Sequence, residues 1–150
     1  MNNKNTRINF SIFFTIFLLT HLFSFNSYGQ KSHIGIWKGA DNGQIGMLDF
    51  KQSGFVTLEL NNEIIGGEKF SQNGIDAQLT YSIDYNSKPI KIDFIVSRLD
   101  TGKEVGRLLG IIEFIGDTRM KVRINFDNPV RPLNFKPEGN SDTIILEKVK

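Results

Sequence analysis

Polar and apolar residues alternate one for one along several stretches of this 150-residue chain. Between residues 77 and 85 every odd position is apolar and every even position is polar. Between residues 119 and 126 the phase is reversed, and the apolar set is Met120, Val122, Ile124 and Phe126. A period of two sends successive side chains to opposite faces of a β-strand, so such a strand covers a core with one face and meets water with the other. No stretch after residue 30 has a helical period over ten or more residues, and the sequence therefore predicts an all-β domain.

Turn signals separate these stretches at short intervals. Asn73-Gly74 and Gly116-Asp117 are two of them, and both Gly and Asn tolerate the positive φ angles that tight hairpins require. The eight or nine predicted strands cover approximately residues 34–39, 45–51, 55–60, 64–70, 77–85, 90–99, 107–115, 118–127 and 143–149. Sequential tight hairpins favour an up-and-down meander, and closing the meander removes its exposed edges. We therefore expect an antiparallel up-and-down barrel of about eight strands, whose interior is either filled by side chains or holds one small ligand.

The first 29 residues have the pattern of a secretory signal peptide. Lys4 and Arg7 precede an apolar run over residues 12–25, and Ser27-Tyr28-Gly29 places small residues at the −3 and −1 positions of a cleavage site. The alternative is an uncleaved membrane anchor, but the run is shorter than the roughly 20 residues that a spanning helix needs. We expect cleavage before Gln30, a single barrel domain over residues 30–150 with no stable membrane anchor, and a periplasmic or extracellular location. The sequence leaves the oligomeric state open.

The charge and composition of residues 30–150 exclude several classes of function. The chain has 18 basic and 16 acidic residues, and Lys4 and Arg7 are the only charged residues before Gln30, so the predicted domain has 16 of each sign. A net charge of zero argues against nucleic-acid binding, which normally requires a basic domain or stripe. Without cysteine, and with His33 as the one histidine of the predicted domain, thiol catalysis and histidine- or cysteine-rich metal sites are excluded. We expect no cofactor, no metal, no catalytic residue and no enzymatic activity.

A series of short motifs occurs in order along the predicted domain. They are Gly35-Ile36-Trp37, Lys88-Pro89, Ile92-Asp93, Gly110-Ile111-Ile112-Glu113-Phe114, Gly116-Asp117 and Arg131-Pro132. In this order they resemble a family of uncharacterised exported bacterial lipocalin-like domains, and the resemblance spans residues 34–148. It is poor between residues 39 and 74, and Ile112 stands where the family often has tyrosine. The resemblance implies a lipocalin-like barrel more than an activity.

The resemblance also implies structural roles for three residues. Lipocalins pair the tryptophan of the Gly-x-Trp motif with a basic residue near the chain end. By that likeness Gly35 and Trp37 are structural, and Lys148 lies across the indole in a cation–π contact. Arg131 is a second candidate for the same contact.

Two classes of function follow from the predicted barrel. The first is binding of a small apolar or amphipathic ligand. The candidate cavity lining is Leu48, Phe50, Leu58, Tyr81, Phe94, Ile112, Glu113, Met120, Val122, Arg123 and Phe126. The second is a structural or interaction domain of the cell envelope, with a filled core and no small ligand. Composition cannot separate them, because the same residues would also form a solid core.

Glu113 and the basic strand that follows it are the polar candidates. The strand around Glu113 is apolar on both sides, so an inward Glu113 would have to be paired, and Arg123 is the plausible partner. A ligand anchor and a catalytic carboxylate are the alternatives. The face with Arg119, Lys121 and Arg123 could hold a phosphate, although a solvated strand face is the simpler interpretation.

Overall fold

The computed structural model describes residues 33–39, 45–126, 129–136 and 143–150. The predicted signal peptide, residues 1–29, lies outside the described residues. The described chain contains strands and no helix, as the alternation predicts, and none of its segments is a helix long and apolar enough to cross a membrane. The strands are β1 (Gly35–Gly39), β2 (Ile45–Phe50), β3 (Val56–Leu60), β4 (Glu63–Gly66), β5 (Phe70–Gln72), β6 (Ile75–Asp84), β7 (Ile90–Arg98), β8 (Glu104–Ile115), β9 (Arg119–Asn125) and β10 (Ile144–Lys148).

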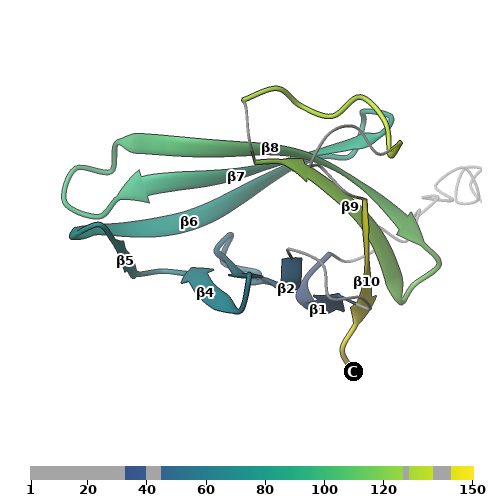
Figure 1. Cartoon of the computed structure of the whole chain (residues 1–150), viewed down its shortest axis with the longest axis horizontal. Helices are drawn as coiled ribbons and strands as arrows, with labels where there is room; N and C mark the ends of the chain where they lie inside the picture. The colour runs from purple at the N-terminus through teal and green to yellow at the C-terminus, as the bar shows by residue number, and fades with distance from the viewer. Residues whose placement is uncertain (1–32, 40–44, 127–128, 137–142) are drawn as a thin grey trace, which may run out of the picture. The chain divides into compact units, whose positions relative to one another are not determined.

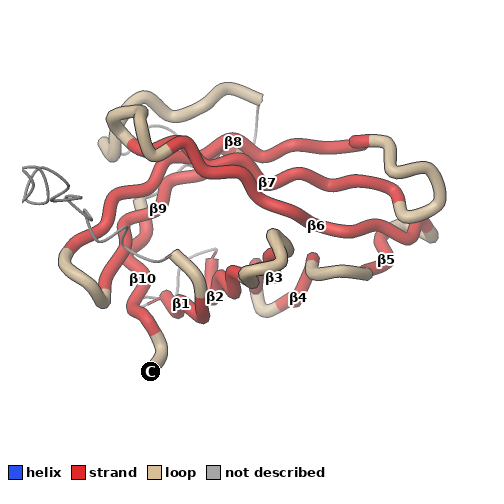
Figure 2. Tube along the Cα trace, turned by 180° about the vertical axis from the view of Figure 1, so that it is seen from behind, coloured by secondary structure: helices blue, strands red, loops and turns tan. Residues whose placement is uncertain are grey.

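All ten strands belong to one antiparallel sheet. Their order is β4-β3-β2-β1-β10-β9-β8-β7-β6-β5, so almost every strand pairs with its neighbour in the sequence. β1 pairs with β10 as well as with β2, which brings the first and last strands together, with Trp37 opposite Lys148. The consecutive strands β4 and β5 stand at the two ends of this order. The long strands β6, β7 and β8 form one wall of the curved sheet, and β1 to β4 lie across from it (Figures 1 and 2).

The two ends of this sheet meet, so that it is nearly closed into a barrel. Phe55 forms an isolated antiparallel bridge with Thr80 of β6. The Leu79 N–H donates to the carbonyl oxygen of Gly67 at 2.9 Å, and the Tyr81 N–H donates to that of Gly54 at 3.1 Å. These contacts join the β3–β4 side of the sheet to β6. They confirm the up-and-down, barrel-like arrangement.

The strand number differs from the expected value of about eight. The strand predicted over residues 64–70 is divided into β4 and β5. The division falls at Gly66 and Gly67, whose φ angles are +105° and +78°. Residues other than glycine rarely adopt this region of backbone conformation. The chain leaves the sheet here, crosses to β6 and pairs with it, and so two short strands replace one.

A continuous apolar core fills the space between the walls. Alternation places Ala77 and Leu79 of β6, and Met120, Val122 and Ile124 of β9, among the buried residues, as predicted. The largest fully buried side chains are Trp37, Phe50, Phe94, Ile45, Leu48, Leu58, Ile92, Ile111, Ile112, Met120, Ile124 and Leu146. Most of them form one contiguous cluster, which also contains Val56 and Val122.

Candidate functional site

An open groove of about 520 Å³ lies at the turn between β6 and β7. Three parts of the chain line it: the turn, the end of β8 and the segment of residues 129–136, which we call the outer segment. The lining residues are Tyr85, Ser87, Lys88, Pro89, Ile90, Ile112, Glu113, Phe114 and Phe135. The walls are therefore mostly apolar, with a few polar groups at the rim.

The groove exists because β7 and β8 differ in length. β7 begins at Ile90, which pairs with Ile112, but β8 continues to Ile115. In the described chain, residues 113–115 of β8 pair with β9 alone. The turn bends away at Pro89 instead of extending β7 along this edge, and the uncovered edge of β8 becomes one wall of the groove.

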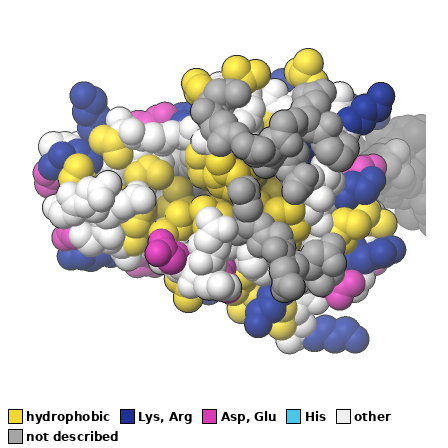
Figure 3. All heavy atoms as spheres, viewed as in Figure 1, with side chains coloured by type: hydrophobic (Ala, Val, Ile, Leu, Met, Phe, Trp, Pro, Cys, Tyr) yellow, Lys and Arg dark blue, Asp and Glu magenta, His cyan; other side chains and the backbone are white. Residues whose placement is uncertain are grey.

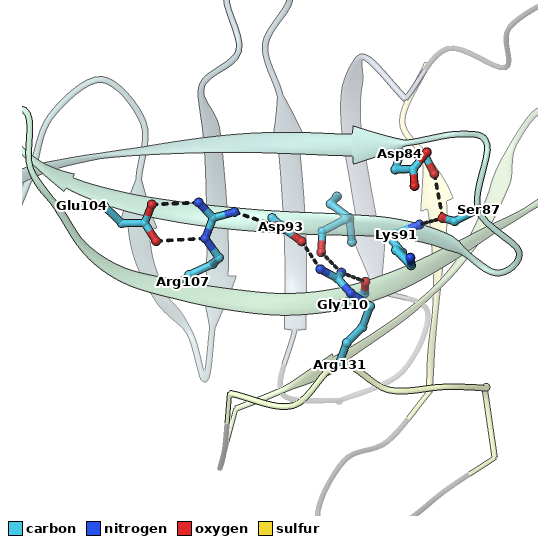
Figure 4. A network of polar contacts seen from close by, with 9 residues as sticks. Asp84, Ser87, Lys91, Asp93, Glu104, Arg107, Gly110 and Arg131 are labelled. Atoms are coloured by element: carbon cyan, nitrogen blue, oxygen red, sulfur yellow. Dashed lines mark hydrogen bonds and ion pairs between the residues drawn. The ribbon is translucent and has the colours of Figure 1, made fainter.

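Local hydrogen bonds fix the turn that forms the second wall. The Ser87 hydroxyl donates to the Asp84 carbonyl oxygen at 2.9 Å and accepts from the Lys91 N–H at 2.9 Å. The Asp84 carboxylate accepts from the Asn86 N–H at 3.0 Å, which is an Asx turn. Figure 4 shows Asp84, Ser87 and Lys91 together at the end of the hairpin. The turn is thus held in place without a ligand.

Arg131 attaches the outer segment to the face of β7 and β8 that points away from the core. Its guanidinium Nη1 donates to the carbonyl oxygens of Ile92 at 2.9 Å and Gly110 at 2.7 Å, and Nη2 forms an ion pair with Asp93 (Figure 4). Arg107 binds the second oxygen of Asp93 at 2.7 Å. The planar guanidinium of arginine can donate to several oxygens at once in fixed directions, which the ammonium of a lysine at this position could not do as well.

The Asp93 carboxylate stays ionised in this network. Burial alone would raise the pKa of Asp93, but hydrogen bonds from Arg131 and Arg107, together with their positive charges, hold it below its ordinary value of 3.8. Arg107 also binds Glu104, at 2.8 Å. Asp93 and Arg131 therefore serve to hold the outer segment on β7 and β8. Because the Arg131 guanidinium is bound here, the candidate contact of Arg131 with Trp37 is wrong.

Three further contacts hold the outer segment beside the groove. Arg123 is 2% exposed and its Nη1 donates to the Asn134 carbonyl oxygen at 2.9 Å. The Lys121 ammonium lies 5.7 Å from the centre of the Phe135 ring. Thr143 donates to the Phe135 carbonyl oxygen at 2.8 Å. Phe135 is therefore a fixed part of the groove wall.

The sequence leaves the orientation of Glu113 open, and the structure contradicts the inward alternative with its pairing to Arg123. The Glu113 side chain is 52% exposed and binds Lys121 at 3.1 Å. The register explains this, because β8 and β9 pair Glu113 with Lys121 and pair Arg123 with Ile111. Ile111 lies on the same face of β8 as Glu113, but that face is covered at Ile111. The Ile111 side chain is 1% exposed, which accounts for an apolar residue on this face.

Lys and Arg side chains do not gather into a basic stripe on the face of the molecule seen in Figure 3. They are spread around its margin with acidic side chains between them. Within the described residues, Lys121 is paired with Glu113 and Arg123 is buried, so the β9 face does not present the free phosphate site that its sequence allows. No group of three or more His, Asp or Glu side chains in the described residues is placed to hold a metal ion.

Trp37 has the basic partner that the lipocalin-like resemblance implies. It is 1% exposed, and the Lys148 ammonium lies 5.1 Å from the centre of its ring, which confirms the cation–π contact. Its Nε1–H donates to the His33 carbonyl oxygen at 2.7 Å. The centre of its ring is 6.0 Å from that of Phe114, a residue of the groove wall.

His33 joins β1 to β6 through two tyrosines, a role that its position near the start of the predicted domain does not suggest. Its Nε2 lies 2.9 Å from the Tyr81 hydroxyl, and its Nδ1 is hydrogen-bonded to the hydroxyl of Tyr85. The Tyr81 hydroxyl donates its one proton to the Lys51 carbonyl oxygen at 2.9 Å. His33 must then donate from Nε2. Burial keeps the pKa of His33 below 6.5, so the ring is neutral at pH 7 and Nδ1 accepts from Tyr85.

We expect this link to make the domain less stable in mild acid. Burial, and to a smaller extent the charge of Lys148, hold the pKa of His33 below its ordinary value of 6.5. The unfolded chain therefore takes up this proton first, so the contribution of His33 is complete above pH 6.5 and is lost as the pH falls through the folded-state pKa. Urea unfolding at pH 7 and pH 5 should show a larger drop in the free energy of unfolding for the wild type than for His33→Gln. Equal drops would contradict the neutral, tyrosine-bonded histidine.

The predicted cavity residues are mostly placed in the core instead of at the groove. Tyr81 and Phe126 pack at the margin of the core, and among the eleven predicted residues only Ile112 and Glu113 border the groove. The fully buried members are Leu48, Phe50, Leu58, Phe94, Ile112, Met120 and Val122. The groove residues that sequence reasoning missed come from the turn, the start of β7, the end of β8 and the outer segment. Their only signals were the Ser87-Lys88-Pro89 break and the irregular composition after residue 128.

Comparisons of the chain with protein-family models, with curated proteins and with solved structures found no match. The class that the geometry defines is an all-β, up-and-down domain that is nearly a closed barrel.

Proposed function

We propose that this is an exported, lipocalin-like, non-catalytic domain that binds a small apolar or amphipathic molecule. The observation that carries the proposal is the groove of about 520 Å³ at the β6–β7 turn. Small-molecule sites are typically concave spaces of several hundred Å³ with mainly apolar walls and a few polar groups. The predicted signal peptide supports export, and the Gly-x-Trp motif with its opposing Lys148 supports the lipocalin-like description.

The ligand position in this proposal is the groove and not the barrel interior. The interior is occupied by the apolar cluster built around Trp37, Phe50 and Phe94. The groove is bounded by structures that are already fixed, namely the hydrogen-bonded turn and the outer segment held by Arg131. A preformed wall lowers the ordering cost of binding, because few side chains have to be immobilised when the ligand arrives.

The packed core also favours a second candidate function. A structural or interaction domain of the cell envelope would need a filled core and no small ligand, and the same cluster provides it. Leu133 of the outer segment is 83% exposed, which is unusual for a large apolar side chain and would suit a contact with another protein. The two functions differ in whether the groove binds a small molecule.

Binding can be measured with N-phenyl-1-naphthylamine, a neutral apolar dye. Phe114 lies between the groove and Trp37, and Trp37 is the only tryptophan of the chain, so a dye in the groove should accept excitation energy from it. We expect saturable binding with one site per domain. Absence of saturable binding would contradict the proposed function and favour the envelope role.

We expect Phe135→Ala to weaken dye binding about three- to tenfold, because it removes part of an apolar wall that contributes roughly 1 kcal/mol of contact. Leu133→Ala is the matched control, since it removes an apolar side chain two residues away that does not line the groove. Dissociation constants from the dye titration should change for the first variant and stay within about twofold for the second. Equal weakening by both variants would place the dye elsewhere.

A further inference from the structure

The polar groups that line the groove are, with one exception, already engaged by the protein itself. The Glu113 carboxylate binds Lys121 at 3.1 Å. The Tyr85 hydroxyl is hydrogen-bonded to His33, and the Ser87 hydroxyl donates to the Asp84 carbonyl oxygen. A ligand that used any of these three groups would have to compete with an internal contact.

Lys88 is the exception. It lines the groove from the turn, its side chain is exposed, and its ammonium forms no ion pair with any residue that the structure describes. It precedes Pro89, whose ring fixes its own φ and removes an N–H donor from the turn. The groove thus has apolar walls and one positive charge that is available to a ligand.

We infer that the ligand is an amphipathic anion, with its apolar part between Ile90, Phe114 and Phe135 and its single negative group at Lys88. The inference rests on the proposed function and specifies the class of ligand. An anionic group placed at the Glu113 side would meet a carboxylate, so charge fixes the orientation of the ligand in the groove. A cationic ligand would meet the free ammonium of Lys88 and a carboxylate that Lys121 already occupies. Charge complementarity therefore favours one sign.

The test compares two probes with related aromatic frames. N-phenyl-1-naphthylamine is neutral, and 1-anilinonaphthalene-8-sulfonate carries one negative charge. We expect the wild-type protein to bind the sulfonate more tightly than the neutral dye, and the advantage to shrink as salt is added because the ion pair lies at an exposed rim. Competition by dodecanoate, dodecanol and dodecylamine should follow the order of carboxylate first, alcohol second and amine last.

Lys88→Gln should weaken binding of the sulfonate about three- to tenfold, which is the range expected for losing one exposed charge-assisted contact. Binding of the neutral dye should stay within about twofold. Lys91→Gln is the matched control, because it removes the same charge three residues away from a side chain that does not line the groove. Lys88→Arg should retain most of the affinity for the sulfonate. Urea unfolding of each variant checks that the domain is intact.

The outcomes separate the two proposals. If neither dye saturates the wild-type protein, the proposed function fails. If the neutral dye binds and responds to Phe135→Ala, but Lys88→Gln and Lys91→Gln affect the sulfonate equally, the anionic ligand class is overturned and the apolar groove remains. A preference for dodecylamine over dodecanoate would overturn it in the same way.

Discussion

Trp37→Ala should lower the free energy of unfolding by about 3–5 kcal/mol, the range measured when a large aromatic side chain is removed from a core. The indole is 1% exposed, so its removal leaves a cavity between β1 and the end of β8. The His33 carbonyl oxygen loses its 2.7 Å donor, and Lys148 loses the ring that it covers. The loss is large because packing, a hydrogen bond and a cation–π contact are removed together.

Urea unfolding followed by circular dichroism measures this loss, since the variant has no tryptophan fluorescence. Trp37→Phe is the graded control: it keeps an aromatic ring but lacks the Nε1–H, and we expect it to lose about 1–2 kcal/mol. Leu133→Ala, at an 83% exposed position, should change the value by less than about 0.5 kcal/mol. A loss below about 1.5 kcal/mol for Trp37→Ala would contradict the role of Trp37 as a tightly packed core residue between β1 and β8.

Local periodicity was sufficient to predict most of the strands. Side-chain alternation is a property of each strand by itself, so β6 and β9 could be recognised without knowledge of their partners. The order of the sheet followed from short turns, which join sequential strands as hairpins. The pairing of β1 with β10 was expected only through the lipocalin resemblance, and the register Trp37 to Lys148 bears out that contact.

The errors and omissions arose where distant parts of the chain determine a residue's surroundings. His33 is bonded to tyrosines 48 and 52 residues away, so its position near the start of the domain gave no indication of its burial. The strand with Glu113 is apolar on both faces because it is covered outside the core as well as inside it. The groove itself depends on where β7 begins relative to β8, a matter of register that alternation does not specify.

Gly66→Ala should lower the free energy of unfolding by about 3–5 kcal/mol, because it adds backbone strain and a steric clash at the same position. Gly66 has a φ of +105°, and a Cβ built on it would lie 2.6 Å from the Leu79 Cδ2 atom and 2.6 Å from the Val56 carbonyl oxygen. The leucine could rotate, but the carbonyl oxygen cannot move freely, since it accepts the Gly67 N–H at 2.8 Å. The variant must therefore displace the chain where β3 and β4 meet β6.

Gly74→Ala separates strain from closure, because Gly74 also has a positive φ, of +76°, but a Cβ there would meet no atom within 4 Å. Its loss should be about 1–2 kcal/mol, the cost of the left-handed backbone alone. Hydrogen exchange at the Leu79 amide, which donates to Gly67 across the closure, should accelerate in Gly66→Ala well beyond its change in Gly74→Ala. Because the groove lies at the β6–β7 turn and not at this closure, the affinity for the neutral dye in the folded Gly66→Ala protein should stay close to the wild-type value. Equal losses of stability in the two variants would show that the two ends of the sheet are not held together at Gly66.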